Sequence, residues 1–139
     1  MSVVIDSSAL VALVQAESEA VRMARWLRED PERLVGAVSF LESVMVLEAR
    51  RGLAGRMGLE AQVRSAGIKL VPFDLAQMQR ACDAYRRFGK GRHPAALNMG
   101  DCATYALVTS GDHKLLCKGN DFTRTDIAGR ILPLGEGAP

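Results

Sequence analysis

The chain has 139 residues, of which 48% are hydrophobic and 24% are charged, and its net charge is +2. This composition is ordinary for one globular domain and excludes a disordered, collagenous or coiled-coil chain. So mild a positive charge neither requires nor excludes a nucleic-acid partner. The three cysteines include no CxxC pair, which indicates reduced thiols in a cytoplasmic protein. No apolar run is long enough to predict a signal peptide or a membrane span.

Short apolar runs alternate with helical segments along the chain. In chain order, the sequence predicts a strand over 3–5, a helix capped by Ser7 or Ser8, a helix over 19–28, a strand over 34–38 and helices over 39–51 and 59–65. A strand over 68–71, a helix over 75–88, a basic loop over 89–98, a helix over 101–109 and strands over 115–117 and 131–133 follow.

Most of the predicted strands are continuously apolar, which is typical of a parallel sheet with both faces covered. The predicted fold is therefore α/β, a three-layer α/β/α sandwich with a central parallel sheet of about five strands. We expect a single domain over residues 1–134 and a loose tail over 135–139.

Four acidic residues fall beyond the carboxyl ends of predicted strands, where ligand sites form in such sheets. Asp6 directly follows the first strand, and Glu42 lies one turn into the helix after the second. Asp101 opens the helix before the fourth strand, and Asp121 follows that strand. Carboxylates in one cleft repel one another, and a divalent cation such as Mg²⁺ or Mn²⁺ relieves the repulsion. Such a site supports hydrolysis of phosphodiesters, although each acid could instead serve only as a helix cap or in a turn.

Four segments match a known family in order: VIDSSA at 4–9, SFLESVMVLEAR at 39–50, HPAALNMGDC at 93–102 and KGNDFTRTDI at 118–127. With these segments the chain resembles PIN-domain ribonucleases, and within them the VapC-type toxins of bacterial toxin–antitoxin pairs. The resemblance implies that Asp6, Glu42, Asp101 and Asp121 form the acidic quartet of the family, with Ser39 as a small polar neighbour. It further implies divalent-metal-dependent cleavage of RNA to 5′-phosphate and 3′-hydroxyl ends, a homodimer, and a cognate VapB-type antitoxin.

Several side chains beside the acids are candidates for binding RNA. Lys118 and Arg124 flank Asp121 and could contact the scissile phosphate, and Ser39 is a further candidate. Arg92 belongs to the basic loop and could follow the RNA backbone. The alternative for each of these charges is an ordinary solvated position. Because aromatic residues make up 5% of the chain, base stacking is not expected to dominate RNA affinity.

Other polar residues are expected to have structural roles. We expect Glu48 to pair with Arg51 on the helix surface, and Asp126 to serve at the surface or as a cap. His93 and His113 have no partners at metal-ligand spacing. The apolar surface of residues 9–14 and of the helix that carries Trp26 is a candidate dimer interface or antitoxin groove, with burial in the core as the default.

Two other functions stay open at the level of sequence. One is a receiver-like or phosphatase domain, which needs a phosphoacceptor aspartate at a strand end, and the VPFD segment at 71–74 offers no obvious one. The other is a catalytically silent RNA- or protein-binding module that keeps the same fold. Trapping an acyl-phosphate on the protein would favour the first alternative. Calorimetry with Mn²⁺ together with an RNase assay distinguishes the second from a nuclease.

Overall fold

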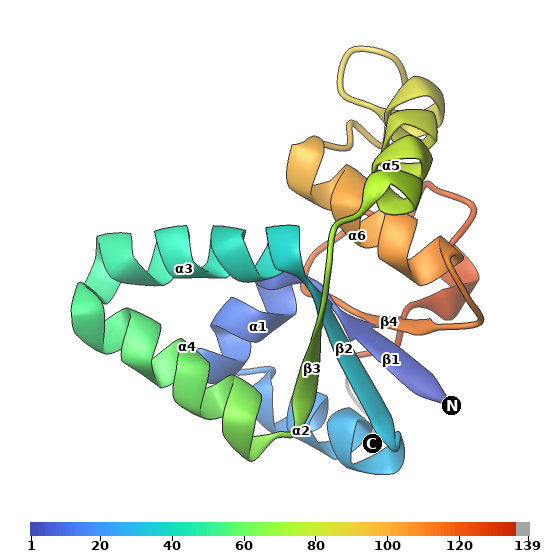
Figure 1. The fold of residues 1–139 in the computed structure, drawn as a ribbon. Helices are drawn as coiled ribbons and strands as arrows, with labels where there is room; N and C mark the ends of the chain where they lie inside the picture. Colours follow the sequence, from blue (N-terminus) through green and yellow to red (C-terminus); the bar gives the residue numbers. More distant parts are fainter. Residues whose placement is uncertain (136–139) are drawn as a thin grey trace.

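The computed structural model describes residues 1–135, so nearly all of the expected C-terminal tail lies outside the described residues. The centre of the fold is a parallel sheet of four strands in the order β3-β2-β1-β4 (Figure 1). The strands are β1 (Ser2–Ile5), β2 (Glu32–Gly36), β3 (Ile68–Val71) and β4 (Lys114–Leu116). In the two central ladders, Val4 lies opposite Leu34 on one side and Leu115 on the other.

Six α-helices and one short 3₁₀ helix surround the described sheet. They are α1 (Ser7–Val14), α2 (Ala20–Glu29), α3 (Ala37–Arg51), α4 (Leu53–Ser65), α5 (Leu75–Phe88), α6 (Met99–Thr109) and η1 (Ala128–Arg130). Figure 1 shows α3 and α4 as an antiparallel pair beside α1, with α5 and α6 stacked on the other side of the sheet. The predicted three-layer α/β/α arrangement is confirmed.

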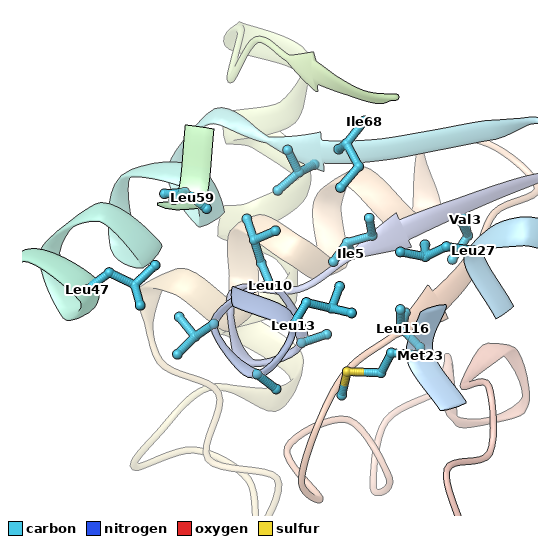
Figure 2. Packing of buried hydrophobic residues seen from close by; sticks show 14 of the residues in the cluster. Val3, Ile5, Leu10, Leu13, Met23, Leu27, Leu47, Leu59, Ile68 and Leu116 are labelled. Carbon is cyan, nitrogen blue, oxygen red and sulfur yellow. The ribbon is translucent and has the colours of Figure 1, made fainter. Parts of the chain in front are cut away.

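The two faces of the sheet carry separate hydrophobic clusters because successive strand side chains point to opposite faces. Val3 and Ile5 of β1 pack with α1, α2, α3 and α4 in the cluster of Figure 2. Val4 points the other way and packs with α5, α6 and the segment after β4. This double coverage explains why β1 is apolar at every position from Val3 to Ile5.

The expected fifth strand over 131–133 is wrong. Ile131 makes one isolated bridge to Leu115, and the Leu132 amide donates to the Leu115 carbonyl at 2.9 Å. Pro133 has no amide hydrogen to extend the ladder. Its carbonyl instead accepts a hydrogen bond from the indole of Trp26 at 2.9 Å.

Several helix boundaries differ from the prediction. Asp6, and not Ser7 or Ser8, caps α1, since its carboxylate accepts the Ser8 amide at 3.1 Å. The first residue of α3 is Ala37, so the expected strand over 34–38 ends at Gly36 and Ser39 does not cap this helix. The α4 helix begins at Leu53, six residues earlier than expected, and α6 begins at Met99.

The apolar surface expected on the first two helices is largely covered. Residues 9–13 of α1 are buried in the core, and Trp26 packs partly buried against the same cluster. Val21 of α2 is exposed, but most of the large exposed hydrophobic side chains lie elsewhere. On α3 and α4 they are Leu41, Met45, Leu53 and Met57, and around α5 and the start of α6 they are Phe73, Leu75, Met78, Tyr85 and Met99. No helix within residues 1–135 is long and apolar enough to cross a bilayer.

Candidate active site

Asp6 lies at the carboxyl end of β1, where it is buried and held by three hydrogen-bond donors. The amide and the hydroxyl of Ser8 donate to Oδ2 at 3.1 and 2.6 Å. The hydroxyl of Thr104, which projects from α6, donates to Oδ1 at 2.6 Å. The Asp6 side chain is therefore fixed by its own helix start and by a helix from the opposite layer of the sandwich.

A buried chain of hydroxyl groups supports Asp6 from behind. The Ser39 hydroxyl lies 3.0 Å from the Thr104 hydroxyl, and both residues are almost fully buried. Because the Thr104 proton points to Asp6, Ser39 donates to Thr104. The structure thus places Ser39 beneath Asp6, in a supporting position. Sequence reasoning missed Thr104, although a polar residue within the apolar run 102–108 was a signal, since buried hydroxyls require partners.

Asp101 closes the capping box at the start of α6 and is under the electrostatic influence of other carboxylates. Its amide donates to the side chain of Asn98 at 2.8 Å, and its Oδ2 accepts the Asn98 amide at 3.1 Å. Burial raises the pKa of Asp101 to about 7, and the charges of Asp121 and Asp6 add to this effect. The N-cap of α6 is therefore Asn98 and not Asp101, as considered from the sequence, and the capping-box contact of Asp101 does not exclude a place in an acidic site.

Glu42 projects from α3 toward the start of α6. A Cβ atom added to Gly100 would overlap the Glu42 carboxylate, so the side chain lies directly against the residue that precedes Asp101. Its Oε1 atom is buried and has no hydrogen-bond partner among residues 1–135. Burial, and then the charge of Asp6, raise the pKa of Glu42, while a hydrogen bond with Ser7 opposes the shift.

Asp121 lies on the exposed segment that follows β4, close enough for its charge to act on Asp101. Cys117 directly follows β4, and the charges of the same acids act on its thiol. Burial raises the pKa of the Cys117 thiol to about 12, and the charges of Asp6, Asp121 and Asp101 contribute in that order. All four predicted acids are thus electrostatically linked at the carboxyl edge of the sheet.

The oxygen ligands of this edge suit a hard divalent cation such as Mg²⁺ or Mn²⁺. Within residues 1–135, no three acidic, His or Cys side chains are already spaced as ligands of one ion. Two other observations indicate that the site suits a cation. They are the unpartnered Oε1 of Glu42 and the raised pKa of Asp101, to which neighbouring carboxylates contribute. Mg²⁺ usually keeps several water ligands and needs only one or two protein carboxylates, so this donor set is sufficient.

The predicted basic residues occupy different surroundings. The Lys118 ammonium forms ion pairs with Glu17 and with Glu19, the latter at 3.4 Å. The Arg92 guanidinium lies 5.0 Å from the ring centre of Tyr85, and Arg124 is exposed on the segment beside Asp121. Lys118 is therefore already neutralised, whereas Arg124 and Arg92 present their charges to solvent.

The residues expected to be structural lie away from the acids or have partners. The Asp126 carboxylate pairs with Arg87 at 2.9 Å. Glu48 is exposed, and in the described part of the chain it forms no ion pair, so the expected pair with Arg51 is wrong. His93 accepts the Ala95 amide at 3.0 Å.

Comparison with known proteins identifies the family of the chain. Residues 3–128 match the PIN domain family. The ribonuclease VapC30 of Mycobacterium tuberculosis is 44% identical over 130 residues, which cover 94% of this chain and 99% of the relative. A ribonuclease VapC of Mycolicibacterium smegmatis is 43% identical over 125 residues, covering 90% of this chain and 97% of the relative.

Solved structures agree at the level of the fold. The crystal structure of M. tuberculosis VapC20, described as a sarcin–ricin loop cleaving toxin, superposes with a TM-score of 0.72 at 15% identity and covers 87% of this chain and 92% of that one. VapBC2 from Rickettsia felis, bound to a DNA fragment from its promoter, superposes with a TM-score of 0.73 at 8% identity. This match covers 91% of this chain and 95% of that one. By the family match and the extent of the sequence identity, the chain belongs to the PIN-domain family and to its VapC ribonucleases.

Proposed function

We propose that this protein is a divalent-metal-dependent endoribonuclease, the toxin of a toxin–antitoxin pair, whose metal site consists of Asp6, Glu42, Asp101 and Asp121. The observation that carries the proposal is the buried, unpartnered Oε1 of Glu42 beside an Asp101 whose pKa is raised to about 7. Unpaired buried oxygens and mutually repelling carboxylates are both costly in a folded protein. A bound Mg²⁺ or Mn²⁺ ion would offset both costs.

The residues of the site have distinct duties in this reaction. When bound, the metal ion lowers the pKa of water and offsets negative charge on the phosphate. Asp6 is held rigidly by Ser8 and Thr104 and so gives the site a fixed ligand. Asp101, whose pKa is raised to about 7, is partly protonated near neutral pH and would give up its proton to hold the cation. Asp121 is exposed and thus lies on the side that RNA can approach.

For the RNA substrate, we assign phosphate contacts to the exposed cations around this edge. Arg124 follows Asp121 closely in the chain, and Arg92 projects from the basic loop. Lys118 contacts phosphate as well when its ion pairs with Glu17 and Glu19 are broken. Ser39 contributes through Thr104 and Asp6, because it is too buried to contact RNA directly. Cationic side chains at this rim compensate the repulsion between RNA and the acids.

The proposed partners are a VapB-type antitoxin and a second copy of the chain. We place the homodimer contact on the α5–α6 apolar face, defined by Phe73, Leu75, Met78, Tyr85 and Met99. This face borders a groove of about 630 Å³ and replaces the first two helices as the candidate interface. The free thiols of Cys82, Cys102 and Cys117 support action in the cytoplasm.

The phosphoacceptor alternative has no support in the site. Asp74, the acid after β3, caps α5 by accepting the Gln77 amide at 2.9 Å. It is therefore committed to the start of a helix. The catalytically silent module stays as an outcome of the test below.

The decisive experiment measures RNA cleavage and Mn²⁺ binding by the purified chain and its Asp6→Asn and Asp101→Asn variants. Cleavage should fall by more than about a hundredfold, because removing even the outer partners of metal ligands costs roughly 10- to 100-fold. Glu60→Gln makes the same carboxylate-to-amide change in an exposed ion pair of α4 and should leave both measurements unchanged. Full activity in either site variant would contradict the assignment. Metal binding without cleavage in the wild type would favour the silent module.

A further inference from the structure

The segment that carries Asp121 has little regular structure of its own. Residues 117–127 connect β4 to η1 through bends and turns, and Asp121 is exposed near their middle. Two apolar side chains, Phe122 and Ile127, are buried in the cluster under α5 and α6. They anchor the segment to the core but do not by themselves fix the direction of the Asp121 carboxylate.

The first part of the segment is attached to the element that carries Asp6. The Lys118 amide donates to the Ser8 hydroxyl at 3.0 Å, and that hydroxyl donates to Asp6 at 2.6 Å. One hydroxyl group thus connects the backbone three residues before Asp121 with the first acid of the site.

The last part of the segment is held by a closed triangle of hydrogen bonds. The Tyr105 hydroxyl donates to Asp126 at 2.8 Å. Arg87 of α5 donates to the Tyr105 oxygen at 3.1 Å and to the other carboxylate oxygen of Asp126 at 2.9 Å. This Arg87–Tyr105–Asp126 triangle therefore ties two helices to the segment, five residues beyond Asp121.

The triangle and Asp101 share one helix. Tyr105 lies four residues after Asp101 on α6, about one helical turn away and on the same side. The segment is thus attached at one end to the element of Asp6 and at the other to the helix of Asp101. We propose that the Arg87–Tyr105–Asp126 triangle is a positioning device that holds Asp121 in register with Asp101 for metal binding. This inference rests on the proposed metal site.

A purely stabilising role does not account for this arrangement well. The side chains of Arg87 and Asp126 are 52% and 47% exposed, and exposed ion pairs add little to stability. Tyr105 is nearly buried, and burial together with the hydrogen bond to Asp126 raises its pKa to about 12. Its hydroxyl accordingly keeps its proton and serves as a donor throughout the physiological pH range.

The test measures Mn²⁺ binding by titration calorimetry on the full chain, together with the thermal midpoint and the Mn²⁺ dependence of RNA cleavage. Tyr105→Phe removes the central hydroxyl and keeps the buried ring. Asp126→Ala removes the exposed carboxylate of the triangle. Both variants should bind Mn²⁺ about tenfold more weakly, the low end of the loss for groups that orient metal ligands. Cleavage should return at high Mn²⁺ concentration. Glu60→Gln, which breaks an exposed ion pair on α4, is the matched control.

Normal Mn²⁺ affinity in both variants would overturn the inference, including when their thermal midpoints fall, because the triangle would then be only structural. The Asp121→Asn variant distinguishes a failure of the positioning role from a failure of the proposed metal site. If it weakens Mn²⁺ binding while the triangle variants do not, the positioning role fails and the metal site stands. If Asp121→Asn and Asp6→Asn both bind Mn²⁺ normally, the proposed metal site fails as well.

Discussion

The burial of Asp101, together with repulsion from Asp121 and Asp6, should make the metal-free protein less stable as the pH rises. The pKa of this carboxyl is about 7 in the folded chain, against 3.8 as its ordinary value, so the folded state binds more protons between these limits. The unfolding free energy therefore falls as the pH increases through this range, and the loss is complete above about pH 7. The direction is opposite to that of an ordinary ion-paired carboxylate.

The magnitude follows from the size of the shift. A change from 3.8 to about 7 corresponds to a ceiling of about 4 kcal/mol, at about 1.4 kcal/mol per pH unit. Between pH 5 and pH 8 the ceiling is about 3 kcal/mol, and we expect about 2 kcal/mol because solvent reaches the Asp121 side of the site. Replacement of Asp101 by Asn removes the titrating group and should remove most of this difference.

Urea unfolding in the presence of a chelator, at several pH values between 5 and 8, measures the effect. The informative quantity is the difference between wild type and Asp101→Asn at each pH, because titration of His113 is common to both proteins. Burial lowers the pKa of His113, which gives a pH dependence of the opposite sign. Parallel curves for wild type and Asp101→Asn would refute the argument, and Glu60→Gln should follow wild type.

Three further changes test other parts of the structure. Gly100→Ala places a methyl group against the Glu42 carboxylate and should weaken Mn²⁺ binding and cleavage, although helix propensity alone favours Ala by about 1 kcal/mol. Thr104→Val leaves Asp6 without one of its donors and should lower the unfolding free energy by about 2 kcal/mol in urea, with reduced cleavage. Met99→Glu introduces a charge into the α5–α6 apolar face and should shift the sedimentation of the proposed dimer to that of the monomer.

Each of these changes has a matched control. Gly129→Ala adds the same methyl group where no atom lies within 4 Å, and should leave Mn²⁺ binding unchanged. Thr104→Ser keeps the hydroxyl donor and should retain most of the stability. Met45→Glu places the same charge on exposed α3 and should not alter sedimentation. If Gly100→Ala behaves like Gly129→Ala, Glu42 is not packed as described. A dimer that withstands Met99→Glu but not Met45→Glu uses the other apolar surface.

The order and class of the elements were predictable because the apolar runs are short and separated by polar turns. The errors arose where tertiary contacts determine the ends of elements. The Ser39–Glu42 spacing is typical of a capping box, yet Ser39 is buried against Thr104 and α3 begins two residues earlier. Residues 131–133 have strand composition, but Pro133 and its bond to Trp26 limit the pairing to one bridge.

The positions of the four acids at one edge of the sheet were predictable because each lies beyond a strand or at the start of a helix beside one. The residues that hold these acids in place were not predictable, because the fold and not the neighbouring sequence determines which group a buried hydroxyl bonds. Thr104 lies 98 residues from Asp6 in sequence, and no spacing rule connects the two. The apolar residues 9–13 illustrate the same limit, because composition could not determine whether they formed the core or an interface.

The free energy that holds a proton on Asp101 also sets how its metal affinity depends on pH. A cation that binds at Asp101 must displace the proton that repulsion and burial hold there, so Mn²⁺ affinity should rise with pH until the group is ionised. With a pKa of about 7, the ionised fraction, and with it the apparent affinity, increases about tenfold between pH 6 and pH 8. Bound Mn²⁺ should also abolish the loss of stability at high pH, since it adds most free energy where the proton is absent. If Mn²⁺ stabilises the chain equally at both pH values, the ion binds elsewhere and Asp101 serves only in the capping box of α6.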